Sequence, residues 1–323
     1  MADAAAGPAR QTAPSGGRAG ERSGQSPPPI SVCIVCRNEA DRLEPCLRSA
    51  TWADEVLVLD LSSSDGSADV ARRHGARVFT REPFPIVEPL RNELADRARN
   101  AWILALDPDE RVTPGLAAEL ARVAARQDVD AVVTPRMNVD LGYPPANPLH
   151  RYEPQIRMYR RDRVRWPEVP NALPEIAPGR LHRLPSRDDL VIVHDRNRTI
   201  PEAVERALRY APVQGQSMVD RGQPFSARAM LGDMAGYAHK QIVRGRAWED
   251  GVPGLLRAGF LLAFRFYVWA AFWQASGARR TAEDDRLLRR LGGVVDALAA
   301  TGRTAGAPWR LARRAAERLR RGG

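Results

Sequence analysis

Short apolar runs alternate with helical segments between residues 30 and 134, and this alternation constrains the fold more than any other feature of the chain. It indicates an α/β domain with a mostly parallel sheet, because each helix returns the chain to the same edge. The runs are almost continuously apolar, as expected for strands that helices cover on both faces. We predict strands over residues 30–36, 55–60, 76–79, 101–106 and 130–134.

The predicted helices lie between these strands and carry recognisable end signals. The first should run to about Ala50, and its Pro45 is tolerable only near the first turn. The second ends at Gly75, a residue type that favours helix C-termini. Residues 88–99 predict a third helix, and Thr113 followed by proline predicts the N-cap of a fourth.

Polar side chains gather where the predicted strands end. In open α/β sheets, ligands bind outside the carboxyl ends of the strands, so the loops leaving those ends mark the expected site without any motif. The candidates are Arg37, Asn38 and Glu39 after the first strand, Asp60, Ser62–Ser64 and Asp65 after the second, and Asp107, Asp109 and Glu110 after the fourth.

The last of these loops, DPDE at residues 107–110, places three carboxylates within four positions. Like charges this close repel, so a partner is expected. Three explanations are open: a general acid–base pair, a site for Mg²⁺ or Mn²⁺ shared with substrate phosphates, or a solvated turn whose acids cap the next helix. The carboxylates at Asp60 and Asp65 on the neighbouring strand favour a ligand site.

The alternation ends near residue 135. Residues 135–200 are rich in proline, arginine and aromatic residues, and they predict a loop-rich region with short strands in QIRMYR and LVIVH. Long loops in a compact domain are usually functional or disordered. We expect a disordered segment over residues 1–29, an α/β domain over 30–200 with a nucleotide-binding half (30–134) and an acceptor region (135–200), and a helical region over 201–323.

The three cysteines, Cys33, Cys36 and Cys46, are expected to be buried thiols. Cys33 and Cys36 point to opposite faces of a predicted strand, which suits neither a redox pair nor a metal clip. Nothing suggests a disulfide framework, which indicates a reducing compartment.

Two C-terminal segments indicate an anionic membrane surface as a partner. Residues 254–275 are apolar and aromatic but contain Arg257 and Arg265, which favours an interfacial helix over a spanning one and leaves a packed core helix open. Residues 308–323 predict a basic helix that would bind anionic lipid, and a merely solvated tail stays open. The chain has a net charge of +10, but no zinc motif, RNP-type motif or clear helix-turn-helix, so we expect no nucleic-acid partner.

The segments ISVCIVCRNE, EVLVLDLSSSDGS, PLRNEL and WILALDPDERV follow one another over about residues 30–120. In this order they resemble the family 2 inverting glycosyltransferases, which have a GT-A fold. The resemblance is nearest to the branch that includes lipopolysaccharide-core glucosyltransferase-like proteins. It implies a Rossmann-like GT-A sheet, a nucleotide-sugar donor (a UDP-sugar is favoured), a glycan or lipid-linked acceptor, and Mg²⁺ or Mn²⁺.

The resemblance also implies roles for individual residues. Ser62 departs from the family, which usually has glycine at this position. The implied nucleotide-sugar-binding residues are Arg37 and Glu39 in the first loop, Asp60 at the base, Asp65 with Gly66 in the second turn, Arg91 with Asn92, and Asp107 at the ribose or the metal's water, and the implied metal ligands are Asp109 and Asp107.

The catalytic base is the weakest part of the resemblance. The family's acceptor region often carries a Val-His-Glu motif, and the best match here is VPNALPE at residues 169–175, where Asn171 and Ala172 replace the His and Glu. An inverting transfer needs a base for the acceptor hydroxyl. Glu168 and Glu175 are the candidates, although neither falls on the motif without a gap.

We therefore expect an inverting hexosyltransferase of cell-envelope biosynthesis, cytoplasmic and peripherally associated with the inner face of the cell membrane. His194 resembles a strand-end histidine of the family's acceptor region, although a lone histidine there is more often structural. One alternative is a nucleotidyltransferase acting on sugar phosphates, which would release pyrophosphate. The other is a catalytically silent nucleotide-sugar-binding protein, which the absence of Val-His-Glu keeps open.

Overall fold

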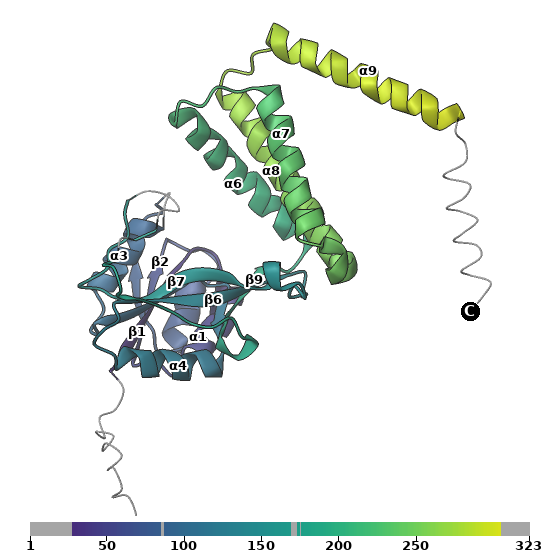
Figure 1. Cartoon of the computed structure of the whole chain (residues 1–323). Coiled ribbons are helices and arrows are strands. Elements are labelled where there is room, and N and C mark those ends of the chain that lie inside the picture. The colour runs from purple at the N-terminus through teal and green to yellow at the C-terminus, as the bar shows by residue number, and fades with distance from the viewer. Residues whose placement is uncertain (1–27, 85–86, 169–172, 175, 305–323) are drawn as a thin grey trace, which may run out of the picture.

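The computed structural model describes residues 28–84, 87–168, 173–174 and 176–304. They form a sheet domain, Ile30–Asn197, and a helical module, Ile200–Thr304, that extends from one side of it (Figure 1). The strands are β1 (Ile30–Cys36), β2 (Glu55–Asp60), β3 (Arg77–Thr80), β4 (Trp102–Leu106), β5 (Glu110–Val112), β6 (Ala131–Asp140), β7 (Glu153–Arg160), β8 (Leu181–Arg183) and β9 (Ile192–Asn197).

The helices of the sheet domain alternate with its first strands, as predicted. They are α1 (Ala40–Ser49), α2 (Ser67–Arg73), α3 (Glu88–Asp96), α4 (Pro114–Ala124), the short α5 (Pro148–Arg151) and the 3₁₀ turn η1 (Asp188–Leu190). The module contains α6 (Ile200–Asp220), α7 (Ala227–Ala238), the π-helical η2 (His239–Arg244), the 3₁₀ turn η3 (Ala247–Asp250), α8 (Gly251–Ala275) and α9 (Ala282–Thr304).

The strands form one mixed, mostly parallel sheet in the order β3-β2-β1-β4-β7-β6-β9-β5, with β8 paired to β6. β3, β2, β1 and β4 are parallel, and Cys36 is level with Asp60 at the carboxyl ends of β1 and β2. β7 runs antiparallel between β4 and β6. The loops after β1, β2 and β4 therefore leave the same edge of the sheet, as predicted.

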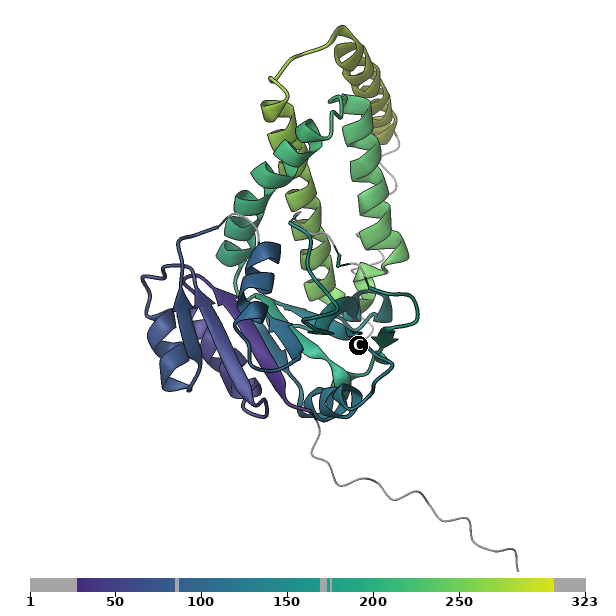
Figure 2. The same ribbon diagram turned by 90° about the vertical axis from the view of Figure 1, so that its left-hand side faces the viewer.

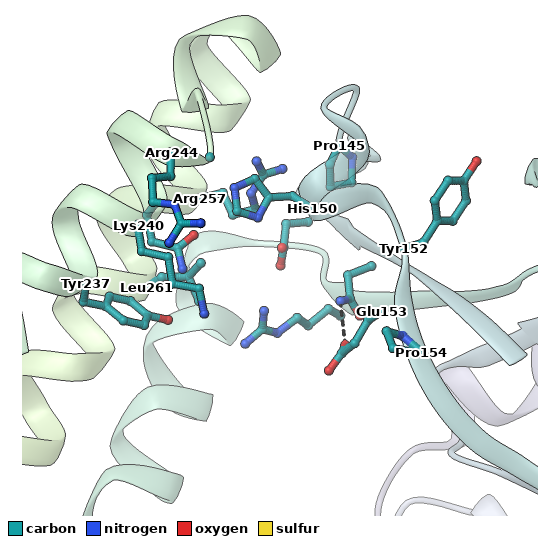
Figure 3. Close-up of a pocket in the computed structure, with 15 residues that line it drawn as sticks. Pro145, His150, Tyr152, Glu153, Pro154, Tyr237, Lys240, Arg244, Arg257 and Leu261 are labelled. Atoms are coloured by element: carbon teal, nitrogen blue, oxygen red, sulfur yellow. Dashed lines mark hydrogen bonds between the residues drawn. The ribbon is translucent and has the colours of Figure 1, made fainter. Parts of the chain in front are cut away.

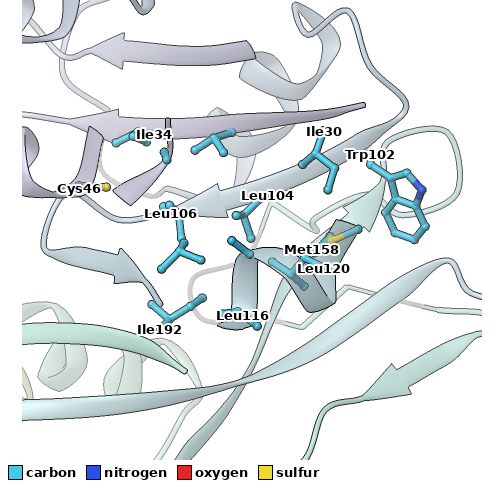
Figure 4. Packing of buried hydrophobic residues seen from close by; sticks show 14 of the residues in the cluster. Ile30, Ile34, Cys46, Trp102, Leu104, Leu106, Leu116, Leu120, Met158 and Ile192 are labelled. Atoms are coloured by element: carbon cyan, nitrogen blue, oxygen red, sulfur yellow. The ribbon is translucent and has the colours of Figure 1, made fainter. Parts of the chain in front are cut away.

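Helices cover both faces of this sheet. On one face, α1, α2 and α4 pack Leu43, Leu47, Leu116 and Leu120 against the strands, together with Met158 of β7 (Figure 4). On the other face, α3 contributes Leu90, Leu94 and Ala95 to a second cluster with Tyr159 and Trp166. Burial on both sides explains why the strands are apolar at nearly every position.

Residues 135–200 are more regular than the sequence suggests. We expected a loop-rich region, but β6 continues to Asp140, and β7, β8 and β9 extend the same sheet. The prediction of short strands in QIRMYR and LVIVH is confirmed. The second half of β6 is hard to recognise in the sequence, because polar side chains such as Arg136 and Asn138 replace apolar ones there.

The helical module has a small core of its own. α6 and α8 pack along each other and bury Ala211, Met218, Val268, Trp269 and Phe272. α7 lies beside them, and α9 follows at the end of the module remote from the sheet (Figures 1 and 2). Gly215 of α6 lies against the α8 backbone, where an added Cβ would approach the Phe272 nitrogen to 2.7 Å.

Three local expectations can be checked. The cysteines are free and buried, with Cys33 in one cluster and Cys36 and Cys46 in the other, so the prediction of buried thiols on opposite faces is confirmed. Pro45 lies in the second turn of α1 rather than near the first. Thr113 occupies the N-cap position of α4, but its hydroxyl donates to the Asp189 and Val191 carbonyls instead of capping the helix.

Candidate active site

The DPDE segment forms a tight turn between β4 and β5. The Glu110 N–H donates to the Asp107 carbonyl (3.0 Å), which closes a β-turn with Pro108 at its second position, where proline's fixed φ is favoured. The Glu110 carboxylate folds back and accepts from the Asp107 N–H (3.1 Å). The turn therefore fixes the backbone of both aspartates at the edge of the sheet.

Arginines of the neighbouring strands hold two of the three carboxylates. Arg157 of β7, which is 2% exposed, donates from Nη2 to Asp107 Oδ2 (2.5 Å) and to Glu110. Arg136 of β6 also pairs with Glu110 (3.1 Å), which is fully buried. Burial raises the pKa of Asp107, but the charges of Arg157 and Arg91 outweigh it and hold that pKa well below its ordinary value.

Asp109 is held from three directions. Its Oδ2 lies 3.4 Å from Arg42 Nη1 of α1, 3.2 Å from Arg206 Nη2 of α6 and 3.2 Å from His194 Nε2 of β9. Burial raises the pKa of Asp109, and the hydrogen bond and charge of His194 with the charge of Arg206 more than offset this and lower it. Arg42 also donates to Glu202 of α6 (2.6 Å), so the helical module contacts the turn directly through Arg206 and indirectly through Glu202 and Arg42.

The orientation of the His194 ring determines which nitrogen faces Asp109 and therefore whether the pair can bind a metal ion. Its Nδ1 faces Asn138 Oδ1 at 2.6 Å, while Asn138 Nδ2 donates to Glu153 (2.9 Å). With the proton on Nδ1, Nε2 donates to Asp109 only in the charged ring, the form that lowers the Asp109 pKa, whereas in the neutral ring Nε2 presents its lone pair to Asp109. An oriented second ring nitrogen is typical of metal-bound histidines. Asp109 and His194 are therefore the two side chains of the turn region that could hold a divalent metal, although Asp109 is also paired with Arg42 and Arg206 and no group of three or more such ligands lies within the described residues.

The predicted loops after β1 and β2 are joined by hydrogen bonds. Asn38 accepts from the Ser64 N–H (2.8 Å), and the buried Asp60 accepts from the Ser63 N–H (3.1 Å). Asp65 accepts from the Ala40 N–H (2.9 Å) and from the N–H and hydroxyl of Ser67. The Asp65 carboxylate is thus engaged in holding the loops together.

Ser62 shows why a glycine suits this turn. Its φ is +56°, in the left-handed region that L side chains rarely adopt, and its hydroxyl donates to the Arg81 carbonyl (3.0 Å). Gly66 has φ +86° at the N-terminus of α2. The departure at Ser62 therefore leaves the turn intact, with some backbone strain.

The two candidates in the loop after β1, Glu39 and Arg37, differ in burial and in their interactions. Glu39 is half-buried, and its burial and the charge of Asp109 raise its pKa, so these two carboxylates lie in one electrostatic neighbourhood. Arg37 is exposed at the same edge and has no side-chain hydrogen bond or ion pair with the part of the chain that the structure describes.

Arg91 of α3 connects the turn with the predicted acceptor region. Its guanidinium lies 3.2 Å from Asp107 and stacks over the Trp166 ring at 4.7 Å. Asn92 donates to the Trp166 carbonyl (2.8 Å) and accepts from its N–H (3.0 Å), so it fixes the loop. Glu168 is exposed two residues further on, whereas residues 169–172 and Glu175 lie outside the described residues.

A cavity of about 550 Å³ lies between the sheet domain and the helical module. Asn138 and Glu153 line it from β6 and β7, and Lys240, Arg244 and Arg257 line it from the module (Figure 3). Because Asn138 also orients His194, the cavity and the turn share a wall.

The sequence reasoning found the acidic residues and missed their partners. Arg42, Arg136, Arg157 and Arg206 were not singled out, because arginine is abundant along the whole chain. One signal could have found one of them: Arg157 lies in the middle of the predicted strand QIRMYR, where a charge is unexpected unless it is paired.

The sequence matches known proteins over much of its length. Residues 31–182 match the profile of the family described as Glycosyl transferase family 2. The lipopolysaccharide core biosynthesis glycosyltransferase LpsC of Rhizobium meliloti is 23% identical over 266 residues, which cover 79% of this chain and 97% of that protein. A TPR repeat-containing protein of Synechococcus elongatus is 30% identical over 135 residues, which cover 41% of this chain and only 34% of that protein.

A solved structure shows a more distant likeness. The mannosyltransferase PcManGT from Pyrobaculum calidifontis, in complex with GDP-Man and Mn²⁺, is 17% identical and aligns over 86% of this chain and 82% of that one, with a TM-score of 0.41. Residues 31–182, which carry the loops after β1 and β2 and the acidic turn, form a glycosyl transferase family 2 domain.

Proposed function

We propose that the protein transfers a hexose, with inversion, from a UDP-sugar to a cell-envelope glycan or a lipid-linked acceptor. The observation that carries this proposal is the convergence of Asp109 and His194 at the carboxyl edge of the parallel strands, beside Arg91 and Arg157. Carboxylate and imidazole can hold a divalent cation, and the surrounding guanidinium groups suit a diphosphate.

Asp109 and His194 would hold Mg²⁺ or Mn²⁺, which supplies Lewis-acid stabilisation of the diphosphate leaving group when bound. Asp107 lies two turn positions away and would contact the ribose or a metal-bound water. The buried Asp60, at the end of β2, would accept a hydrogen bond from the base. Arg37 and Glu39 lie at the same edge and complete the nucleotide-facing set.

The base for the acceptor hydroxyl is proposed among the acids near Trp166. Glu168 is exposed and follows the segment that Asn92 fixes, so its backbone approaches the site from the acceptor side. Glu175 remains a second candidate.

We further propose that the protein lies peripherally on the cytoplasmic face of the cell membrane. Within the described residues, one helical stretch, Ala247–Ala275, is long and apolar enough to cross a membrane by length and composition. Its two arginines are neutralised inside the module: Arg257 pairs with Asp250, and Arg265 pairs with Asp233 through two bonds of 2.6 and 2.8 Å.

The exposed side of α8 also suits lipid. Leu255, Phe266 and Trp273 are exposed and fall on one side, because they lie nearly whole turns apart at about 3.6 residues per turn. α9 presents a second exposed stripe with Leu288, Leu291 and Val295. A helix that is apolar all round but packed on one side needs a further apolar surface, and a bilayer provides one.

The products formed from a panel of nucleotide sugars, with Mn²⁺ and envelope lipids as acceptors, test the activity. A nucleoside diphosphate is expected, whereas pyrophosphate would indicate nucleotidyl transfer and no turnover would indicate a binding protein. Asp109→Asn preserves shape and should lower the rate by at least about 100-fold. Asp128→Asn, at an exposed acid paired with Arg126, is the matched control and should act like wild type. Equal rates in both variants would remove Asp109 from the site.

A further inference from the structure

The cavity between the sheet domain and the helical module is positively charged. Arg196 of β9 and Lys240 and Arg244 of η2 line it, and none of the three side chains has a hydrogen bond or ion pair with the part of the chain that the structure describes. Arg257, a fourth lining cation, is already paired with Asp250. Three guanidinium or ammonium groups therefore face one opening without a protein counter-charge bonded to them.

The acids that line the same cavity have other partners. Glu153 accepts from Arg136 (2.6 Å) and Asn138 (2.9 Å), and Asp140 accepts from Asn197 (2.7 Å). The charges of these acids therefore offset the cations only partly. Figure 3 shows Lys240 and Arg244 extending from the helices towards the strand that carries Glu153.

The position of the cavity limits what it can hold. Asn138 joins its wall to His194, and His194 lies 3.2 Å from Asp109, so the cavity begins one residue away from the proposed reaction centre. The donor's phosphates are assigned above to the turn, near Arg91, and neither Arg91 nor the turn aspartates line this cavity. The cavity is therefore a second pocket, linked to the turn through Asn138 and His194.

We propose that this cavity binds a phosphate group carried by the acceptor, with Arg196, Lys240 and Arg244 as its cationic ligands. The proposal rests on the proposed function, since it assigns a substrate class to the same site. Phosphate accepts several charge-assisted hydrogen bonds at once, and clustered cations without protein partners provide them. The phosphate could belong to a lipid carrier or to a phosphorylated glycan, two sources of one chemistry.

Calorimetry with two probes distinguishes these sources. Farnesyl phosphate represents a lipid phosphate and glucose 6-phosphate a sugar phosphate, and UDP reports on the donor site. At least one phosphate probe should bind, more weakly at high salt and below about pH 6, where the dianion takes up a proton. The probe that binds more tightly identifies the source.

The double variant Lys240→Ala/Arg244→Ala should weaken that binding by at least about tenfold, with UDP affinity within about twofold of wild type. Both side chains are exposed, so the fold should persist, and circular dichroism checks it. The matched control Arg209→Ala/Arg228→Ala removes two exposed charges of the same module that lie outside the cavity and have no side-chain partner among the described residues, and it should change nothing.

The inference is overturned if wild type binds UDP but neither phosphate probe, or if the double variant and the control weaken binding equally. A parallel loss of UDP affinity in the double variant would place these cations in the donor site and also overturn it. Failure of wild type to bind UDP and every nucleotide sugar is a different result, because it contradicts the proposed function itself.

Discussion

The sheet domain and the helical module bury their apolar side chains to different degrees. In the sheet domain, helices close both faces, and residues such as Leu43, Leu90 and Leu104 are fully buried. The module buries a cluster of five residues, while Val213 and Val252 remain 58% and 68% exposed. The sheet domain therefore leaves few large apolar side chains exposed, whereas the module leaves many, and patches of this kind mark interaction surfaces.

The two regions also use buried charge differently. In the sheet domain, Arg157 neutralises carboxylates that the site needs at the edge of the core. In the module, Asp233 neutralises Arg265 and also accepts from Trp269 Nε1 (2.7 Å), which leaves α8 without an unpaired charge in its middle. Paired charge thus lies beside the acidic turn in one region and within an apolar helix in the other.

The largest expected effect is on the stability of the sheet domain. Arg157→Ala should lower the free energy of unfolding by about 3–5 kcal/mol, because Asp107 and Glu110 lose their buried partner. Urea unfolding followed by circular dichroism measures it. Arg126→Ala removes a surface partner of Asp128 and should cost less than about 1 kcal/mol. An equal loss of unfolding free energy in the two variants would show that the buried ion pairs of Arg157 stabilise the fold no more than the surface pair of Arg126 does.

The next effect concerns the exposed face of the module. Leu255→Glu/Phe266→Glu should weaken binding to anionic vesicles by at least about tenfold, since each inserted side chain contributes roughly 1.5–3 kcal/mol. The free energy of unfolding should be unchanged, because both side chains are exposed. The control Phe84→Glu/Tyr143→Glu alters two exposed aromatics of the sheet domain and should leave vesicle sedimentation as in wild type. If wild type ignores vesicles, the membrane proposal fails.

A smaller effect should appear in the pH dependence of stability. The pKa of Asp107 is lowered in the folded state, so its contribution is fully present above its unfolded pKa of about 3.9 and is lost as pH falls further. The urea midpoint of wild type should therefore fall between pH 5 and pH 3. Asp107→Asn should flatten this fall, and an unchanged slope would assign the acid sensitivity to other groups.

The smallest effect is expected at Ser62. Ser62→Gly relieves a φ of +56° but removes the hydroxyl bond to Arg81, so stability should rise by less than about 1 kcal/mol. Thermal unfolding measures the change. A loss of stability would mean that the hydroxyl bond outweighs the backbone strain.

Local pattern predicted the first half of the sheet closely, since β1 and β2 begin and end at the predicted residues. It failed for the second half of β6, where Arg136 and Asn138 serve the site and break the apolar pattern. Because the loops after β1 and β4 leave the same edge of the sheet, the sequence predicted that Asp107 and Asp109 would lie near Glu39. It could not predict Arg206, because a contact between residues so far apart in sequence depends on how α6 returns to the sheet.

The contacts of α6 with Asp109 and Arg42 determine whether the sheet domain can be separated from the helical module. The family profile ends at residue 182, yet His194, Glu202 and Arg206 lie beyond it and contact Asp109 or its partner Arg42. A fragment ending at residue 199 would keep the whole sheet but leave Arg42 and Asp109 each short of one partner. The boundary between the two regions along the chain therefore does not separate two independent units, and exchanging the module for that of a relative would require the turn to be refitted as well.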